Sequence, residues 1–296
     1  MEKSQNIITG IADEASEGLQ TQIEVHKTLG WNYIELRNID GENISQLSDE
    51  KFSSIYRQLS GSDMHVIAFS SPIANWGRPI TGDFKEDIDD LKRSIPRMHK
   101  LGTKYIRIMS YPNDGLPESE WERRVFKRIR ELTKIAEDGE VILVHENCDG
   151  WASQSPENLE SLIKGIDSSA LRIVFDSGNV VAHGGSDADT WKFYLAAKPF
   201  IVHFHIKDCF EDKKTENGEV LHTYPGEGSS GVRDIIIDLL KSGYRGAFSI
   251  EPHIAVQIHL GTKTSEHPEA KSIYLEYGNR TNDLFKSINE SLKDLN

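Results

Sequence analysis

Short apolar runs alternate along the chain with longer segments in which apolar residues recur every three or four positions. Eight of the runs are rich in β-branched residues, and they lie at 6–12, 33–36, 65–69, 105–109, 141–144, 171–175, 201–206 and 247–250. Runs that are apolar on both faces are typical of strands buried in a parallel sheet. The pattern therefore predicts eight such strands.

The segments between the runs predict helices, at 18–30, 44–63, 84–102, 122–138, 155–167, 189–198 and 231–244, with a last helix over 272–296. Gly30, Gly102 and Gly243 each stand just before the next strand begins, as glycine does where a helix ends. Strict alternation of strand and helix predicts an α/β fold of the (β/α)8 TIM-barrel type. An open doubly wound sheet is the alternative, but it would normally show a glycine fingerprint after the first strand, and segment 10–16 lacks one.

Four runs in the second half of the chain lead into a residue that can bind a metal ion. These residues are Glu146, Asp176, His205 and Glu251, separated by 30, 29 and 46 residues. No local motif binds a metal with such gaps, whereas a closed parallel barrel brings the C-terminal ends of its strands to one mouth. The set suits one divalent cation, Mn²⁺ or Mg²⁺ first, with Co²⁺ or Zn²⁺ also accepted. It is more typical of an enzyme than of a binding module.

Each of the four residues also has a purely structural interpretation. Glu146 and Glu251 would then be solvated loop acids or helix caps, and Asp176 a salt-bridge partner or cap. A single strand histidine is more often a satisfied core residue than a ligand. Strand alternation places His203 and His205 on the same face, however, which favours the interior of the barrel.

Length, charge and cysteine content narrow the class of protein. A chain of 296 residues suits one large barrel, so we expect a single domain over 1–296. The net charge of −13 argues against a nucleic-acid partner. No apolar run approaches the ~20 residues that span a bilayer, and the first residues lack a signal-peptide core. With only Cys148 and Cys209, both expected to be reduced thiols, we expect a cytoplasmic protein without membrane association.

Five segments carry a family resemblance: GWNYIELR (30–37), HEN (145–147), FDSGN (175–179), HFHIKD (203–208) and PGEGSSGVRDIIIDLLKSGYRGAFSIEPH (225–253). Through them nearly the whole chain resembles the xylose isomerase-like TIM-barrel superfamily of sugar phosphate isomerases and epimerases, which includes inosose dehydratases, ketose 3-epimerases and hydroxypyruvate isomerases. The resemblance implies a small carbohydrate substrate, and barrels of this group often form homo-oligomers.

The resemblance also implies a role for each of the four residues. Glu146, Asp176, His205 and Glu251 would bind one divalent metal, and the two glutamates would be catalytic, removing and returning a proton on opposite faces of the substrate. A metal that chelates a carbonyl and its neighbouring hydroxyl acidifies the shared C–H and stabilises the enediolate. A carboxylate held beside it can act as the general base.

Asn179 is a departure from part of the family pattern. Many ketose epimerases have a histidine three residues after the strand-six aspartate, whereas the form FDSGN resembles dehydratase-like members. An amide can bind a substrate hydroxyl but does not shuttle a proton at neutral pH. Asn179 is therefore expected to bind substrate, and it argues against 3-epimerase activity without affecting metal binding.

Lys207 and Arg37 are further candidates for substrate binding. Lys207 could bind a hydroxylate or phosphate or polarise a carbonyl, and its structural alternative is a salt bridge to Asp208 or Glu35. Arg37 either pairs with Glu35 or reaches the substrate.

His253 and Trp76 complete the set of candidate substrate-binding residues. His253 follows Glu251 by two positions, so it would share its face if the strand continued. Trp76 and Trp151 lie after the third and fifth predicted strands, where an aromatic ring could stack on a sugar or simply pack in a loop. Arg107 is expected in a buried ion pair. Specificity is expected in the loops at 70–82, 110–120, 147–156, 208–230 and 254–270.

The leading hypothesis is a metal-dependent isomerase, epimerase or dehydratase acting on a sugar, keto-sugar or cyclitol. An apurinic endonuclease shares the barrel and part of the ligand set, but Asn179 replaces one of its histidines and segment 209–218 lacks its DRH-type motif. A non-catalytic sugar-binding barrel is the third hypothesis. The presence of both candidate base carboxylates argues against it.

Overall fold

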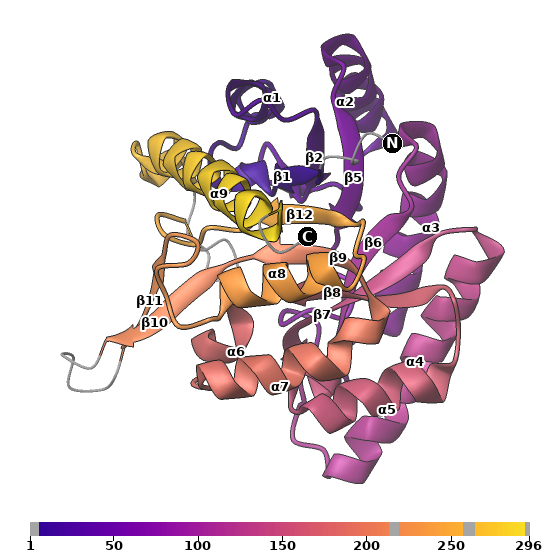
Figure 1. Ribbon diagram of the computed structural model, residues 1–296. Coiled ribbons are helices and arrows are strands. Elements are labelled where there is room, and N and C mark those ends of the chain that lie inside the picture. Colours follow the sequence, from indigo (N-terminus) through magenta and orange to yellow (C-terminus); the bar gives the residue numbers. More distant parts are fainter. Residues whose placement is uncertain (1–5, 213–218, 257–263, 294–296) are drawn as a thin grey trace.

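Eight parallel strands form a nearly closed barrel with helices packed around its outside (Figure 1). The computed structural model describes residues 6–212, 219–256 and 264–293. The strands are β1 (Ile8–Gly10), β2 (Tyr33–Leu36), β5 (His65–Ser70), β6 (Tyr105–Ser110), β7 (Ile142–Gly150), β8 (Leu171–Asp176), β9 (Ile201–Ile206) and β12 (Ala247–Ile250). Their order is β1-β12-β9-β8-β7-β6-β5-β2, and a parallel bridge between Ile11 and Glu35 links the two end strands. The predicted TIM-barrel fold is confirmed.

The helices between the strands match the predicted segments closely. They are α1 (Leu19–Thr28), α2 (Asp49–Ser62), α3 (Phe84–Leu101), α4 (Glu118–Asp138), α5 (Pro156–Ile166), α7 (Asp187–Ala197), α8 (Val232–Lys241) and α9 (Ala270–Lys293). Helix α2 begins five residues later than predicted, because the Ser48 hydroxyl accepts the Lys51 amide at 3.2 Å and caps it there. Among the described residues, no helix has the length and apolar character needed to cross a membrane.

Four segments differ from the prediction near the mouth of the barrel. Strand β7 runs on to Gly150, so Glu146 lies inside a strand rather than in a loop after it. The segment predicted as one long polar loop contains an antiparallel hairpin of β10 (Asp208–Asp212) and β11 (Glu219–Thr223), which projects from the barrel (Figure 1). A short helix α6 (Asn179–Ala182) follows β8, and two short strands β3 (Asn38–Ile39) and β4 (Glu42–Asn43) follow β2. Part of the predicted loop over the mouth, 257–263, lies outside the described residues.

The outward faces of β8, β9 and β12 pack through aromatic rings. Phe175, Phe204 and Phe248 are fully buried. The ring centroids of Phe248 and of Phe285 in α9 are 4.9 Å apart. Successive side chains of a strand point to opposite faces. The residue after each phenylalanine therefore points into the barrel. Two of these residues, Asp176 of β8 and His205 of β9, are register partners.

His26 of α1 is a buried histidine that joins α1, β2 and α9. Its Nδ1 lies 2.6 Å from the Tyr33 carbonyl oxygen and its Nε2 lies 2.9 Å from the Tyr274 hydroxyl. Burial lowers the pKa of His26 to about 4, and the hydrogen bond to Tyr33 offsets only part of that shift. The folded protein therefore holds this proton less tightly than the unfolded chain, whose histidine pKa is about 6.5.

This difference predicts a loss of stability on acidification. The contribution of His26 to the free energy of unfolding is constant above about pH 6.5. It declines as the pH falls toward 4, by about 3 kcal/mol in total. Urea denaturation of the wild type and of His26→Gln at pH 7, 5.5 and 4 measures it. The free energy of unfolding should fall less steeply with pH in the variant, and parallel curves would contradict this role of His26.

Candidate metal centre

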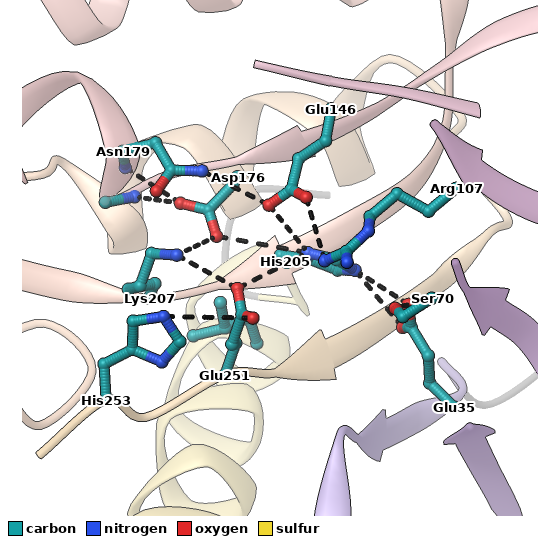
Figure 2. A network of polar contacts seen from close by, with 12 residues as sticks. Glu35, Ser70, Arg107, Glu146, Asp176, Asn179, His205, Lys207, Glu251 and His253 are labelled. Atoms are coloured by element: carbon teal, nitrogen blue, oxygen red, sulfur yellow. Dashed lines mark hydrogen bonds and ion pairs between the residues drawn. The ribbon is translucent and has the colours of Figure 1, made fainter. Parts of the chain in front are cut away.

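Four side chains that lie far apart in the sequence meet at the C-terminal end of the barrel (Figure 2). Glu146 comes from β7, Asp176 ends β8, His205 lies in β9, and Glu251 directly follows β12. All four are buried, and one ligand atom of each lies within 4.8 Å of those of the others. The strand ends thus bring together the four residues that the sequence pattern singled out.

His205 occupies the middle of this group. Its Nδ1 lies 3.5 Å from Glu146 Oε1, 3.8 Å from Glu251 Oε2 and 4.0 Å from Asp176 Oδ2. Within the described part of the chain, this buried nitrogen has no hydrogen-bond partner. Glu146 Oε2 and Asp176 Oδ2 accept no hydrogen bond there either, although a cationic side chain lies beside each of them. Three carboxylates and one imidazole in this arrangement form a donor set that fits a divalent cation.

Lys207 lies against two of the carboxylates. Its Nζ is 2.9 Å from Asp176 Oδ2 and 3.0 Å from Glu251 Oε2 (Figure 2). The structural alternative to substrate binding, a salt bridge to Asp208 or Glu35, is wrong. Asp208 accepts backbone N–H groups of the loop before α8, and Glu35 lies against His203 and His205 instead. Burial lowers the pKa of Lys207, but Asp176 and Glu251 outweigh burial and hold it well above its usual range. Lys207 is therefore charged.

Two arginines hold the glutamates. Arg107 Nη1 lies 3.1 Å from Glu146 Oε2, so the expected buried ion pair of Arg107 is confirmed, and Arg37 Nη1 lies 2.6 Å from Glu251 Oε1. Arg37 therefore does not pair with Glu35, which was one of its two expected roles. Leaving a buried carboxylate without its cationic partner would destabilise the folded protein. These arginines thus fix the orientation of the two candidate catalytic carboxylates.

The pKa values of the three carboxyl groups diverge. Burial raises the pKa of Glu146, but the charge of Arg107 outweighs it and brings the value to about 2. Burial likewise opposes the charges of Lys207, His253 and Arg37 at Glu251, and these charges hold its pKa well below the usual range. The pKa of Asp176 is raised to about 7, mainly by burial. The charges of Glu251 and Glu146 add to this shift, and the charge of Lys207 offsets only part of it. Asp176 is thus the carboxyl group most prone to keep a proton.

Asn179 contacts the candidate ligands directly. Its Nδ2 donates to Glu146 Oε1 at 3.2 Å, and its backbone N–H donates to Asp176 Oδ1 at 2.9 Å. Gly178 makes this turn possible, because a Cβ on it would lie 2.6 Å from Lys207 Cγ. The segment FDSGN therefore shapes the turn that orients two of the four residues.

Two acids that sequence reasoning missed surround Arg37. Asp13 Oδ1 and Glu14 Oε1 lie 2.9 Å and 3.1 Å from Arg37 Nη2. Both residues belong to a short 3-10 helix directly after β1. Their position at a strand end is the same signal that identified the other four residues, and it would have identified them as well.

His253 lies at the site for a different reason than expected. Strand β12 ends at Ile250, and His253 has a left-handed backbone with φ of 55°, so the strand does not continue. Its Nδ1 and its backbone N–H lie 2.8 Å from the two carboxylate oxygens of Glu14. Its Nε2 is 4.0 Å from Glu251 Oε1. Glu14, not strand alternation, holds this ring beside Glu251.

A cavity of about 320 Å³ opens above these residues, and Glu146 and Glu251 line it. All five candidate substrate-binding residues line it too: Arg37, Trp76, Asn179, Lys207 and His253. Val220 and His222 of the β10–β11 hairpin form part of its wall. Trp151 is instead buried, and its Nε1 donates to Glu118 Oε1 at 2.8 Å, which leaves only the packing role for it.

Comparisons with known proteins agree with this geometry. Residues 23–271 match the family model described as Xylose isomerase-like TIM barrel. An inosose dehydratase of Bacillus thuringiensis (strain Al Hakam) is 24% identical over 198 residues, which cover 58% of this chain and 64% of the relative. The chain thus spans less than two thirds of the length of the curated relatives that it matches.

Solved structures share the fold over nearly the whole chain. A xylose isomerase-like TIM barrel protein from Mycobacterium smegmatis, in complex with magnesium, has a TM-score of 0.68 at 18% identity and covers 94% of this chain and 97% of its own. The IOLI protein with a bound zinc atom has a TM-score of 0.70 at 18% identity, with coverage of 96% and 99%.

Proposed function

Since the chain belongs to the xylose isomerase-like TIM-barrel family, we propose that it is a divalent-metal-dependent enzyme acting on a keto-sugar or cyclitol through an enediolate. The observation that carries this proposal is the group of four buried donors with ligand atoms within 4.8 Å of one another, two of which, Glu146 and Glu251, line a cavity. We further propose that residues 1–296 form a single domain, since the family match covers most of the chain.

In this proposal Glu146, Asp176, His205 and Glu251 hold one divalent ion, Mn²⁺ or Mg²⁺ in the first place and Co²⁺ or Zn²⁺ as alternatives. Such an ion supplies Lewis acidity, which makes the C–H between a carbonyl and a hydroxyl more acidic. Glu251, which is ionised and lines the cavity, removes that proton, and Glu146 serves on the other side of the substrate.

The remaining polar residues of the cavity bind and orient the substrate. Lys207 and Arg37 each keep N–H groups beside Glu251, where they can donate to substrate oxygens while holding the base in place. Asn179 donates to a hydroxyl, His253 contacts the substrate beside Glu251, and Trp76 packs on the ring. The β10–β11 hairpin contributes to the choice of substrate through Val220 and His222.

Of the reactions open to an enediolate, we favour loss of water over return of the proton to the opposite face. Asn179 stands where an epimerase of this family would carry a histidine, and its amide here donates to Glu146 instead of titrating. The matched curated relatives named inosose dehydratase support the same choice.

A turnover screen tests the proposed function. Chelator-treated protein is incubated with a panel of ketoses and inososes, with and without Mn²⁺, Mg²⁺ or Co²⁺, and the products are identified by NMR. We expect conversion of at least one neutral keto-compound only when metal is present, and loss of water as the dominant reaction. Epimerised product without dehydration would overturn the choice of reaction, and turnover that persists in excess chelator would overturn the metal dependence.

A further inference from the structure

Glu35 lies at the centre of a second group of polar residues, next to the candidate metal centre, that the proposed reaction does not use. Its carboxylate comes from β2, is 1% exposed, and faces His205 from inside the barrel (Figure 2). The two residues are 170 positions apart in the chain. From this contact we infer that Glu35 is a positioning residue, which fixes His205 so that its Nδ1 faces Glu146, Asp176 and Glu251. The inference rests on the proposed function in so far as it presumes a metal ion.

The contacts of Glu35 define which nitrogen of His205 carries a proton. His205 Nε2 lies 3.1 Å and 3.2 Å from the two Glu35 oxygens. An ionised carboxylate only accepts hydrogen bonds, so Nε2 must donate. When a metal ion takes the place of the proton on the other nitrogen, Nδ1 offers its lone pair, and Nδ1 is the atom that lies 3.5–4.0 Å from the three carboxylates.

Glu35 is itself held in place from two further sides. The Ser70 hydroxyl donates to Oε1 at 2.6 Å, and His203 Nε2 lies 2.7 Å from Oε2. Together with His205, these donors hold both oxygens of Glu35 in place from β5 and β9.

Glu35 is not a fifth member of the ligand group. The four residues whose ligand atoms come together are Glu146, Asp176, His205 and Glu251, and Glu35 groups only with His203 and His205. Both Glu35 oxygens are already occupied by hydrogen bonds at 2.6–3.2 Å. A carboxylate that orients a histidine in this way typically contributes 10- to 100-fold to metal affinity.

Two variants of similar size separate the charge of Glu35 from its ability to accept a hydrogen bond from His205. Glu35→Gln keeps an acceptor oxygen but loses the charge, and Glu35→Leu loses both. Calorimetric titration of Co²⁺ into chelator-stripped protein should show affinity reduced about 10-fold in Glu35→Gln and about 100-fold in Glu35→Leu. The control is Asp90→Asn, which removes the buried charge of Asp90 of α3 from its ion pair with Arg78 and should leave Co²⁺ affinity unchanged.

Proton NMR of the Co²⁺-loaded protein reports on the His205 N–H itself, and a general loss of stability would not change this signal. The N–H of a cobalt-bound histidine appears as a strongly shifted, solvent-exchangeable signal. In the wild type we expect this signal to persist because Glu35 protects the Nε2–H of His205, and in Glu35→Leu we expect it to broaden or vanish. If either variant does not fold, Ser70→Ala replaces it, with an expected loss of affinity of a few-fold.

The outcomes separate this inference from the proposed function. Wild-type affinity and an unchanged N–H signal in the folded Glu35 variants would overturn the role of Glu35 and leave the metal centre standing. A wild type that binds no divalent ion would overturn the proposed function and this inference together.

Discussion

Glu251→Gln is expected to lower kcat by about 10³-fold when measured at saturating metal with a substrate from the screen. A positioned general base contributes about 10²- to 10⁴-fold to the rate, and an amide of the same size does not take up a proton. The variant keeps an oxygen that can accept the hydrogen bond of Arg37 Nη1, now 2.6 Å from Glu251 Oε1. The cavity should therefore keep its shape while the chemistry fails.

The control for Glu251→Gln is the same substitution outside the cavity. Glu227→Gln makes the same change on an exposed side chain that pairs with Arg280, and it should leave kcat unchanged. Metal content is measured in parallel, because Glu251 is both a candidate ligand and the candidate base. A Glu251→Gln protein that holds its metal and retains kcat within tenfold of the wild type would refute Glu251 as the base.

Lys207→Met is expected to have the largest effect on stability. Lys207 Nζ is 2.9–3.0 Å from Asp176 and Glu251, and all three side chains are buried. Removing one partner of a buried ion pair leaves an uncompensated charge and costs about 3–5 kcal/mol. We expect the free energy of unfolding of the chelator-treated protein to fall by that amount in urea denaturation.

A divalent ion should offset much of this loss. It would neutralise the same two carboxylates, which lack a cationic partner at Lys207 only in the variant, so it should stabilise Lys207→Met more than the wild type. A ligand present at 100 times its Kd stabilises the folded state by about 2.7 kcal/mol. The control is Lys51→Met, which breaks an exposed pair with Glu42 and should change the free energy of unfolding by less than about 1 kcal/mol. Equal losses in Lys207→Met with and without metal would argue that the ion does not bind at these carboxylates.

The fold was predictable from the chain because its signals are local. Apolar runs of strand length alternate with helical periodicity, and all eight runs became strands of the barrel. The same alternation placed His203 and His205 on one face, where both contact Glu35. Alternation also turns Lys207 to that face, where it pairs with Asp176 and Glu251.

The partners of the buried charges were not predictable in the same way. Arg37 pairs with Asp13, Glu14 and Glu251, and the last of these is 214 positions away. Which charges meet inside a barrel depends on its closure and stagger, and no local pattern records either. The left-handed backbone of His253 is another tertiary effect, since its two bonds to Glu14 hold a conformation that histidine rarely adopts.

Deuterium uptake tests whether a divalent ion acidifies the substrate. We propose that an ion held by Glu146, Asp176, His205 and Glu251 makes a substrate C–H acidic enough for Glu251 to remove the proton. Chelator-stripped and metal-reloaded protein are incubated in D₂O with the keto-compound converted fastest in the screen, and deuterium in substrate and product is measured by mass spectrometry. We expect incorporation next to the carbonyl with the reloaded wild type, and none above background with the stripped protein or with Glu251→Gln. Equal incorporation by stripped and reloaded protein would contradict this proposal.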